Sequence, residues 1–308
     1  MCIRDRRYYD CSVVLGVTEI GHEGLYYCVV TNASGVAVSD HCLLLTQRKM
    51  VEYTFESLNG TTVPDSSPSR FDGTLVSVVE GGYPAHGGLV PGMVGKAIKL
   101  IGGEDPNEGY IDTGKTALEL GIEGARPRSV SVWVKTLDMA RSGVYSVGRY
   151  QSMEAFGLHN SNDLTVSFTY QFDHWGSNWD YTGWVFDKWI HVVHVYDGAN
   201  VRIYIDGEKL ADYAAALNTA PDGQPFAVGF WGSYSGVQHG VFNGRIDEFA
   251  LYNYALSPQE IAQLYVAGVG GTACVEAPQH DLTGDCQVDL EDFAIFAAAW
   301  AQSSLVSP

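Results

Sequence analysis

Alternating apolar and polar residues dominate the middle of the chain. Such alternation over four to eight residues is the pattern of a β-strand with one buried face. It recurs, with glycine-containing turns in between, at residues 51–55, 97–101, 129–134, 163–170, 189–196, 200–208, 225–229 and 244–252. The dipeptides Asp197-Gly198 and Asp206-Gly207 are typical of hairpin turns. The pattern predicts a large all-β domain.

One helix is predicted after these strands. Ser257 and Glu260 have the spacing of a capping box, and Pro258 stands at the first helical position. Ile261 and Leu264 then fall on one face. Many strands with a single late helix indicate two packed sheets.

The chain before residue 50 predicts an incomplete β-domain. Tyr26 stands two residues before Cys28, and Asn32 and Gly35 follow at a turn. This spacing resembles the end of an immunoglobulin-like domain, which implies that the tyrosine hydroxyl bonds back to the corner backbone. Only the last strands are present in 1–49, so we expect a marginal unit, a natural protein that continues upstream, and residues 1–6 that are foreign to it. A free-standing hairpin is the alternative.

Seven motifs of the central segment occur in the order of a known family. They are 53–55, 60–67, 94–100, 189–195 with 197–198, 201–207, 244–253 and 255–261. Residues 50–268 therefore resemble a laminin-G-like, concanavalin-A-like jelly roll. The resemblance implies a carbohydrate or protein ligand, often with one Ca²⁺, and Asp65 and Asp247 as calcium ligands that join the termini of the domain. A turn cap and a salt-bridged edge residue are the alternative roles of these two carboxylates.

We expect this domain to be non-catalytic. Hydrolases on such sandwiches need two carboxylates about 5 to 9 Å apart across a cleft. Asp247 and Glu248 are adjacent, so simple alternation places them on opposite faces of their strand. His191 and His194 likewise face opposite ways, which favours structural roles over metal binding.

Residues 172–184 contain several aromatic side chains without clean alternation. Exposed rings in such a loop stack on sugar rings, while Asp and Asn bond the hydroxyls. The predicted sugar-binding residues are Trp175, Trp179, Tyr181, Trp231 and Tyr234. Burial of some of these rings in the core is the alternative.

Residues 269–308 form a linker followed by a predicted calcium loop. The oxygen ligands are expected from Asp281, Thr283, Asp285, Gln287, Asp289 and Asp292, a spacing that suits one central Ca²⁺. The loop and the amphipathic helix after it resemble one repeat of a dockerin-type module, which implies a cohesin-like partner. Cys286 stands where the family has glycine. Cys274 with Cys286, and Cys11 with Cys42, are candidate disulfides, although the sequence leaves the pairing open. If a Cys274–Cys286 bond forms, the compartment is oxidising.

The net charge of the sequence narrows the classes of binding partner that we expect. The 36 acidic and 18 basic residues give a formal net charge of −18, which disfavours nucleic acid and anionic membranes. No apolar run is long enough to span a bilayer. The sequence thus predicts an extracellular binding or adhesion module for carbohydrate and calcium. The alternatives are the accessory C-terminal region of a secreted glycoside hydrolase, or a structural spacer.

Overall fold

The structure of the 308-residue chain is a computed structural model. It describes residues 3–5, 8–10, 20–77, 86–102, 109–137, 142–149, 153–161, 169–173, 179–181, 183, 185–234, 237–272, 275, 279–283 and 287–300. Only the backbone is described at residues 3–5, 8–10, 20, 42, 43, 87, 142, 159–161, 169–173, 179–181, 232–234 and 237–239.

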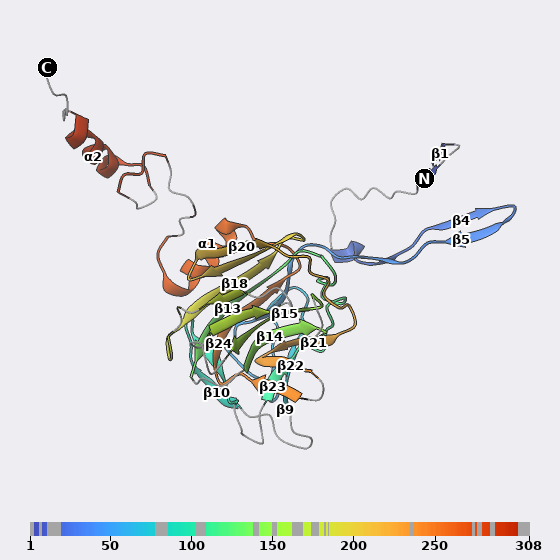
Figure 1. The fold of residues 1–308 in the computed structure, drawn as a ribbon, viewed down its shortest axis with the longest axis horizontal. Helices are drawn as coiled ribbons and strands as arrows, with labels where there is room; N and C mark the ends of the chain where they lie inside the picture. The colour runs from blue at the N-terminus through green and yellow to red at the C-terminus, as the bar shows by residue number, and fades with distance from the viewer. Residues whose placement is uncertain are drawn as a thin grey trace.

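Two mainly antiparallel sheets form a jelly-roll sandwich, as predicted (Figure 1). The back sheet contains, in spatial order, β10 (His86–Pro91), β11 (Lys96–Leu100), β24 (Gly244–Tyr252), β13 (Arg128–Thr136), β18 (Ile190–Tyr196), β19 (Asn200–Ile205) and β20 (Glu208–Ala214), with β7 (Lys49–Tyr53) beside β24. The front sheet contains β17 (Trp179–Tyr181), β16 (Thr169–Asp173), β15 (Ala155–Ser161), β14 (Ser142–Gly148), β21 (Gln224–Val228), β12 (Gly109–Asp112), β9 (Gly73–Ser77) and β8 (Thr62–Val63). A hairpin of β22 (Phe230–Tyr234) and β23 (Val237–Val241) joins the front sheet at β14.

Most predicted strands are confirmed. The segments 129–134, 189–196 and 244–252 are the adjacent central strands β13, β18 and β24, whose side chains are almost all buried. The segment 200–208 divides at the predicted Asp206-Gly207 turn, where both residues have positive φ. The hairpin β14–β15 was not predicted, because its glycines interrupt the alternation. Most of the predicted strand 163–170 lies outside the described residues.

Helix α1 (Pro258–Val269) has the predicted capping box. The Ser257 hydroxyl accepts a hydrogen bond from the Glu260 amide at 3.3 Å, and the Glu260 carboxylate accepts from the Ser257 amide at 2.7 Å. Ile261 then packs on Val193 and Tyr204, which face outward from the back sheet. Within the described residues, neither α1 nor α2 (Leu290–Trp300) has the length and apolar character that a bilayer-spanning helix needs.

A buried arginine lies between the two sheets. Arg128 has no exposed surface, and its guanidinium stacks 4.7 Å from the ring centre of Phe156 in β15 and 4.9 Å from that of Tyr196 in β18. Its Nη1 donates to the carbonyl of Ile122 at 2.9 Å, and its Nη2 donates to the Thr219 hydroxyl at 2.6 Å. Burial lowers the pKa of Arg128 to about 9, which leaves it charged at neutral pH. One cation therefore connects both sheets and two loops.

The N-terminal strands lie outside the sandwich. They are β1 (Ile3–Asp5) with β2 (Tyr8–Asp10), β3 (Gly24–Tyr26) with β6 (Cys42–Leu44), and β4 (Val29–Asn32) with β5 (Gly35–Val38), and η1 (Ile20–His22) precedes β3. The β4–β5 hairpin extends away from the sandwich, and every residue in it is exposed (Figure 1). The Tyr26 hydroxyl donates to the His22 carbonyl at 2.6 Å, which confirms the predicted tyrosine contact.

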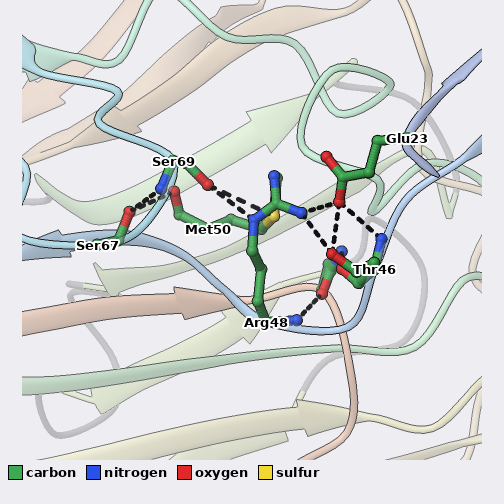
Figure 2. A network of polar contacts seen from close by, with 7 residues as sticks. Glu23, Thr46, Arg48, Met50, Ser67 and Ser69 are labelled. Atoms are coloured by element: carbon green, nitrogen blue, oxygen red, sulfur yellow. Dashed lines mark hydrogen bonds and ion pairs between the residues drawn. The ribbon is translucent and has the colours of Figure 1, made fainter. Parts of the chain in front are cut away.

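A polar network attaches this segment to the sandwich (Figure 2). Glu23 accepts hydrogen bonds from the amide of Thr46 at 2.8 Å and from its hydroxyl at 2.6 Å, and it forms an ion pair with Arg48. The Arg48 side chain also donates to the Ser69 hydroxyl at 3.1 Å. Asn253, just after β24, accepts from the Arg48 amide at 2.8 Å. The network fixes where the segment enters the sandwich.

Replacing Arg128 tests its structural role. Arg128→Met leaves several buried carbonyls without a donor, so we expect the free energy of unfolding to fall by about 3 kcal/mol. Arg126→Met removes a partly exposed ion pair with Glu123. It is expected to change the free energy of unfolding by less than about 1 kcal/mol. Denaturant titration of both variants measures the difference; equal losses would contradict the assigned role.

Candidate functional site

The outer face of the front sheet carries a row of polar residues over β15, β16 and β17. Leu158 of β15 is buried in the core, so its neighbours Gly157 and His159 occupy the outer face. The register places His159 opposite Gln171 of β16, and Gln171 opposite Asp180 of β17. Directly opposite residues of antiparallel strands share a face. Three residues with hydrogen-bonding side chains therefore occupy one line across three strands.

The same face is polar and aromatic further along the sheet. The Ser146 hydroxyl donates to the carbonyl of Phe230 at 2.8 Å and accepts from the Gln224 amide at 2.7 Å. The ring of Tyr110 stacks on that of Phe230 with 4.5 Å between centres. Burial, helped by the charge of Asp112, raises the pKa of the Tyr110 hydroxyl. Phe230 is buried with Ala227 and Val241, so this part of the outer face is covered by a small apolar cluster.

The prediction that Trp231 is an exposed sugar-stacking residue is wrong. Trp231 is only 1% exposed. Its ring lies against Gly157, where an added Cβ would come within 2.2 Å of the indole Cζ3. A Cβ at Gly143 would likewise approach the Trp231 backbone nitrogen to 2.1 Å. Two glycines in neighbouring strands leave room for this residue, and sequence alternation does not reveal that room.

The other predicted sugar-binding residues stay predictions. Trp179 pairs with Phe172, which in turn pairs with Leu158 of the core. Tyr181 is two residues further along β17, so both backbone positions belong to the inner face of the sheet. Trp175 and the side chains of Trp179, Tyr181 and Tyr234 lie outside the described residues.

Asp65 has the role of a turn cap. One of its oxygens accepts from the amides of Glu52 and Ser67, both at 2.8 Å. The other accepts from the amide of Phe71 and the hydroxyl of Ser67, both at 2.7 Å. Hydrogen-bond donors surround this carboxylate, whereas Ca²⁺ requires six to eight oxygen ligands. The described His, Cys, Asp and Glu residues contain no group of three placed to hold a metal ion. That the pair Asp65 and Asp247 binds calcium stays a prediction.

Strand β24 has a bulge at Glu248. Ser131 of β13 pairs with Ala250, but Trp133 pairs with Asp247, so β24 has one residue more than β13 in this interval. Glu248 has a φ of 46°, in the left-handed region that favours glycine. The extra residue interrupts the alternation that the sequence analysis assumed.

Asp247 and Glu248 consequently lie on the same side of the back sheet, against the prediction. The Asp247 carboxylate accepts from the amides of Met93 at 2.8 Å and Val94 at 3.0 Å in the β10–β11 turn. Glu248 lines a cavity that Val94 also lines. Burial raises the pKa of Asp247 to about 7 despite these hydrogen bonds. Burial and the nearby Glu52 also raise the pKa of Glu248.

The cavity, of about 100 Å³, lies between the outer face of the back sheet, the β10–β11 turn and the C-terminal half of α1. The lining residues that are partly exposed to solvent are charged, and the buried lining residues are polar or aromatic. The residues that determine its chemistry are Lys49, Glu52, Ser131, Trp133, His191 and Glu248.

Ser131 and His191 form a buried pair at the base of this cavity. The Ser131 Oγ and the His191 Nε2 are 2.9 Å apart. Trp133 packs against the imidazole at 5.0 Å between ring centres, and Tyr265 of α1 stacks on Trp133 at 5.8 Å. Burial lowers the pKa of His191 to about 3, so the imidazole is neutral. A hydrolytic triad needs an acid on the second ring nitrogen, and among the described residues the His191 Nδ1 has no hydrogen-bond partner.

His194 faces the interior of the sandwich instead. Its Nδ1 is 3.0 Å from the Tyr145 hydroxyl, and its ring stacks on Phe156 at 4.1 Å. The prediction that His191 and His194 point in opposite directions and have structural contacts is confirmed.

The C-terminal loop is closed by Asp292. One of its oxygens accepts from the amides of Leu282 at 2.7 Å and Thr283 at 2.9 Å, and the other accepts from the amide of Asp289 at 2.8 Å. The Thr283 hydroxyl lies 3.2 Å from the Asp281 carboxylate and 3.1 Å from that of Asp292. The amides of Asp289 and Thr283 lower the pKa of Asp292 to about 2. Three of the six predicted calcium ligands are thus brought together.

The remaining predicted ligands and the disulfides are not tested. Gln287 is exposed at the start of the described C-terminal segment. Cys28 is a free thiol. Asp285, Cys11, Cys274, Cys286 and the Cys42 side chain lie outside the described residues.

The sequence of the sandwich matches a known family. A family model described as the Concanavalin A-like lectin/glucanases superfamily matches residues 105–262, from just before β12 into α1. The chain belongs to this superfamily. No curated protein matches its sequence.

Solved structures share the superfamily fold. Domain 4 of AbnA, a GH43 extracellular arabinanase from Geobacillus stearothermophilus in complex with arabinotriose, matches with a TM-score of 0.53 and 20% identity over 71% of this chain and 98% of that chain. Botulinum neurotoxin type C matches with a TM-score of 0.50 and 13% identity, over 71% of this chain and 51% of that chain. A mutant of Trypanosoma rangeli sialidase displaying trans-sialidase activity gives 0.50 and 18%, over 72% and 33%. At these identities the likeness shows the fold alone.

The neutral, buried His191 predicts a dependence of stability on acid. Its folded pKa of about 3 lies below the ordinary histidine pKa of 6.5, so between these values only the unfolded chain gains the proton. Stability from this group is complete above pH 6.5 and is expected to fall by about 2 kcal/mol by pH 5. His191→Gln should lose that part of the pH dependence, whereas His41→Gln, on the exposed N-terminal segment, should keep it. Urea unfolding at pH 7 and pH 5 measures the free energy of unfolding of both variants. If His191→Gln loses as much of it between these pH values as the wild type does, the neutral buried state assigned to His191 is contradicted.

Proposed function

We propose that the sandwich is a non-catalytic carbohydrate-binding module that works outside the cell. The observation that carries this proposal is the line of His159, Gln171 and Asp180 on the outer face of the front sheet. The likeness to the arabinanase domain, which holds arabinotriose and is matched over 98% of its length, supports it at the level of the fold.

The chemistry of the row suits sugar hydroxyls. An amide both donates and accepts, a carboxylate accepts, and an imidazole does either. Adjacent strands lie about 4.8 Å apart, so a row over three strands spans about 10 Å. A short oligosaccharide covers that distance.

Binding without hydrolysis is the reading we favour. Asp173 occupies the same face, diagonal to Asp180, and a diagonal pair in a sheet is about 7 to 8 Å apart. That separation falls within the range of glycoside hydrolases. Hydrolysis would also require one of these two acids, Asp173 or Asp180, to be held protonated near neutral pH. The assay below therefore measures product release together with binding.

The proposed setting is a secreted or surface-attached protein in which this module serves a polysaccharide-degrading or adhesive function. In that setting a cohesin-like protein is the partner proposed for the C-terminal segment.

The glycan site is tested by affinity electrophoresis on arabinan and other plant and bacterial polysaccharides. The wild-type chain should be retarded by at least one polymer. Gln171→Ala with Asp180→Asn should weaken that binding at least about tenfold, because each lost hydrogen bond to a sugar contributes on the order of 1 kcal/mol. Gln263→Ala, an exposed glutamine on α1, is the matched control.

Three outcomes would count against this proposal. The first is that no polymer retards the wild-type chain. The second is that the double variant is retarded as strongly as the wild type. The third is that the wild type releases reducing sugar and the double variant does not. The last result would assign a hydrolase instead of a binding module.

We further propose that the loop from Asp281 to Asp292 binds Ca²⁺. In its support, Asp281, Thr283 and Asp292 already share a hydrogen-bonded cluster. Asp292 is nearly buried in the first turn of α2, where its carboxylate also accepts from the amide of Asp289, the residue before the helix. A bound cation would replace the amide groups as the partner of these oxygens. The loop would then be ordered around the cation.

Calcium removal tests this second proposal. The helix after Asp292 exposes most of its apolar residues, so it has little packing of its own. Chelation with EDTA is expected to reduce the helical circular dichroism signal of the chain, and added Ca²⁺ should restore it. Asp292→Asn should abolish the response, and Asp222→Asn, an exposed acid in the sandwich, should not. A spectrum that is insensitive to chelator contradicts the proposal.

A further inference from the structure

Three basic side chains form a row across the outer face of the back sheet. The register places Lys99 of β11 directly opposite Arg245 of β24, and Arg245 directly opposite Lys135 of β13. The neighbour of each along its strand is buried in the core, so all three occupy the outer face. These core neighbours are Ile98, Ile246 and Val134. A chain with a formal net charge of −18 therefore has a local strip of positive charge, which we call the basic row.

The basic row is unfavourable without a counter-ion. Like charges on directly opposite residues of adjacent strands destabilise a sheet. Among the described residues, the side chains of Lys99 and Arg245 form no ion pair and no hydrogen bond. The Arg245 Nε is buried, but its two terminal nitrogens and the Lys99 Nζ are not buried and can reach a ligand. Two of the three cations are thus free to bind an anion from outside the chain.

One acid offsets part of the charge of the basic row. The Asp187 carboxylate forms a 2.9 Å ion pair with Lys135, and its side chain is 69% exposed. The hydrogen bond and charge of Lys135, with a smaller contribution from Arg245, lower the pKa of Asp187. Asp247 is also on this face, two residues after Arg245, but its pKa of about 7 leaves it only partly charged at neutral pH. Among the described residues, the row therefore keeps a net positive charge.

The two ends of the basic row are open and aromatic. At one end, Lys99 lies opposite Gly88 of β10, and a Cβ added at Gly88 would meet no atom within 4 Å. At the other end, the Lys135 ammonium lies 5.9 Å from the ring centre of Trp189, just before β18. Trp189 is partly exposed, and such a ring stacks on the C–H face of a sugar. Cations and an indole face therefore share one line.

We propose that the basic row binds an acidic saccharide, whose carboxylates pair with Lys99 and Arg245 while one of its sugar rings stacks on Trp189. A guanidinium takes a carboxylate through two parallel hydrogen bonds, and an ammonium adds a further charged donor. The row from Lys99 to Trp189 covers three intervals between strands, about 14 Å, which suits a short oligosaccharide.

The overall charge of the chain restricts which anion this is. A net charge of −18 repels polymers of high charge density such as nucleic acid, so the ligand has to combine few charges with other contacts. A uronic acid oligosaccharide meets this requirement, because it carries one carboxylate on each sugar ring and offers the ring itself to Trp189.

This site goes beyond the glycan site proposed above, since it lies on the other sheet and selects a charged ligand. Gln171→Ala with Asp180→Asn is expected to leave uronate binding unchanged. Variants of the basic row are expected to leave retardation by a neutral polymer such as arabinan unchanged. Failure of one proposal is thus separable from failure of the other.

The test is isothermal titration of the intact chain with tetragalacturonate and with its methyl ester, which has the same rings but no charge. EDTA is present, so that Ca²⁺ does not link the ligand to the protein. We expect saturable binding of tetragalacturonate that weakens as salt is added, and no binding of the ester. Equal binding of the ester, or no saturable binding of tetragalacturonate, would overturn the proposal.

Two variants locate the binding. Lys99→Gln with Arg245→Gln should weaken it at least about tenfold, because two charge-assisted hydrogen bonds are lost. Lys209→Gln, an exposed lysine on β20 of the same sheet, is the matched control and should bind as the wild type. Circular dichroism checks that both variants are folded. Wild-type affinity in the double variant would contradict the assignment of this row.

Asp187→Asn gives a result that misfolding cannot mimic. It removes the competing carboxylate, and asparagine tolerates the positive φ of 52° at this position. Binding of tetragalacturonate should therefore become several-fold tighter. Unchanged or weaker binding in this variant would overturn the proposal, as would binding of a single-stranded DNA oligomer of equal charge with the same affinity.

Discussion

The sandwich depends on one buried positive charge. Arg128 begins β13, and its guanidinium is enclosed by Phe156 from the front sheet and Tyr196 from the back sheet. Desolvating a cation is expensive, and the carbonyls that accept from it offset that expense only in one geometry. The two sheets and the loop before β13 therefore meet in a single arrangement.

The two outer faces differ because only one of them is covered by α1. On the back sheet, α1 packs on an apolar patch around Val193 and leaves a small cavity at its C-terminal end. On the front sheet, the β22–β23 hairpin and the ring of Trp231 cover part of the surface. The neighbouring strands β15 to β17 keep a polar outer row.

Regular alternation was enough to predict the central strands and the two sheets, and the spacing of Ser257 and Glu260 was enough to predict the capping box of α1. It was not enough where a strand departs from regularity. Glu248 lies on the outer side because of a bulge that pairs with β13, a partner more than a hundred residues earlier in the chain. Trp231 is buried because Gly157, on another strand, leaves space for it. The polar row exists only through the register of three strands. Pairing between distant strands therefore decides the candidate sites, and a single sequence does not contain it.

The most direct measurement is an amide NMR titration of the intact chain with arabinotriose or with a polymer that retards it. If the front sheet is the glycan-binding face, the largest shifts should fall on β15, β16 and β17 around His159, Gln171 and Asp180, and α1 and β18 should remain unchanged. Shifts confined to the back sheet, or no shifts with any retarding sugar, would contradict the assignment of this face.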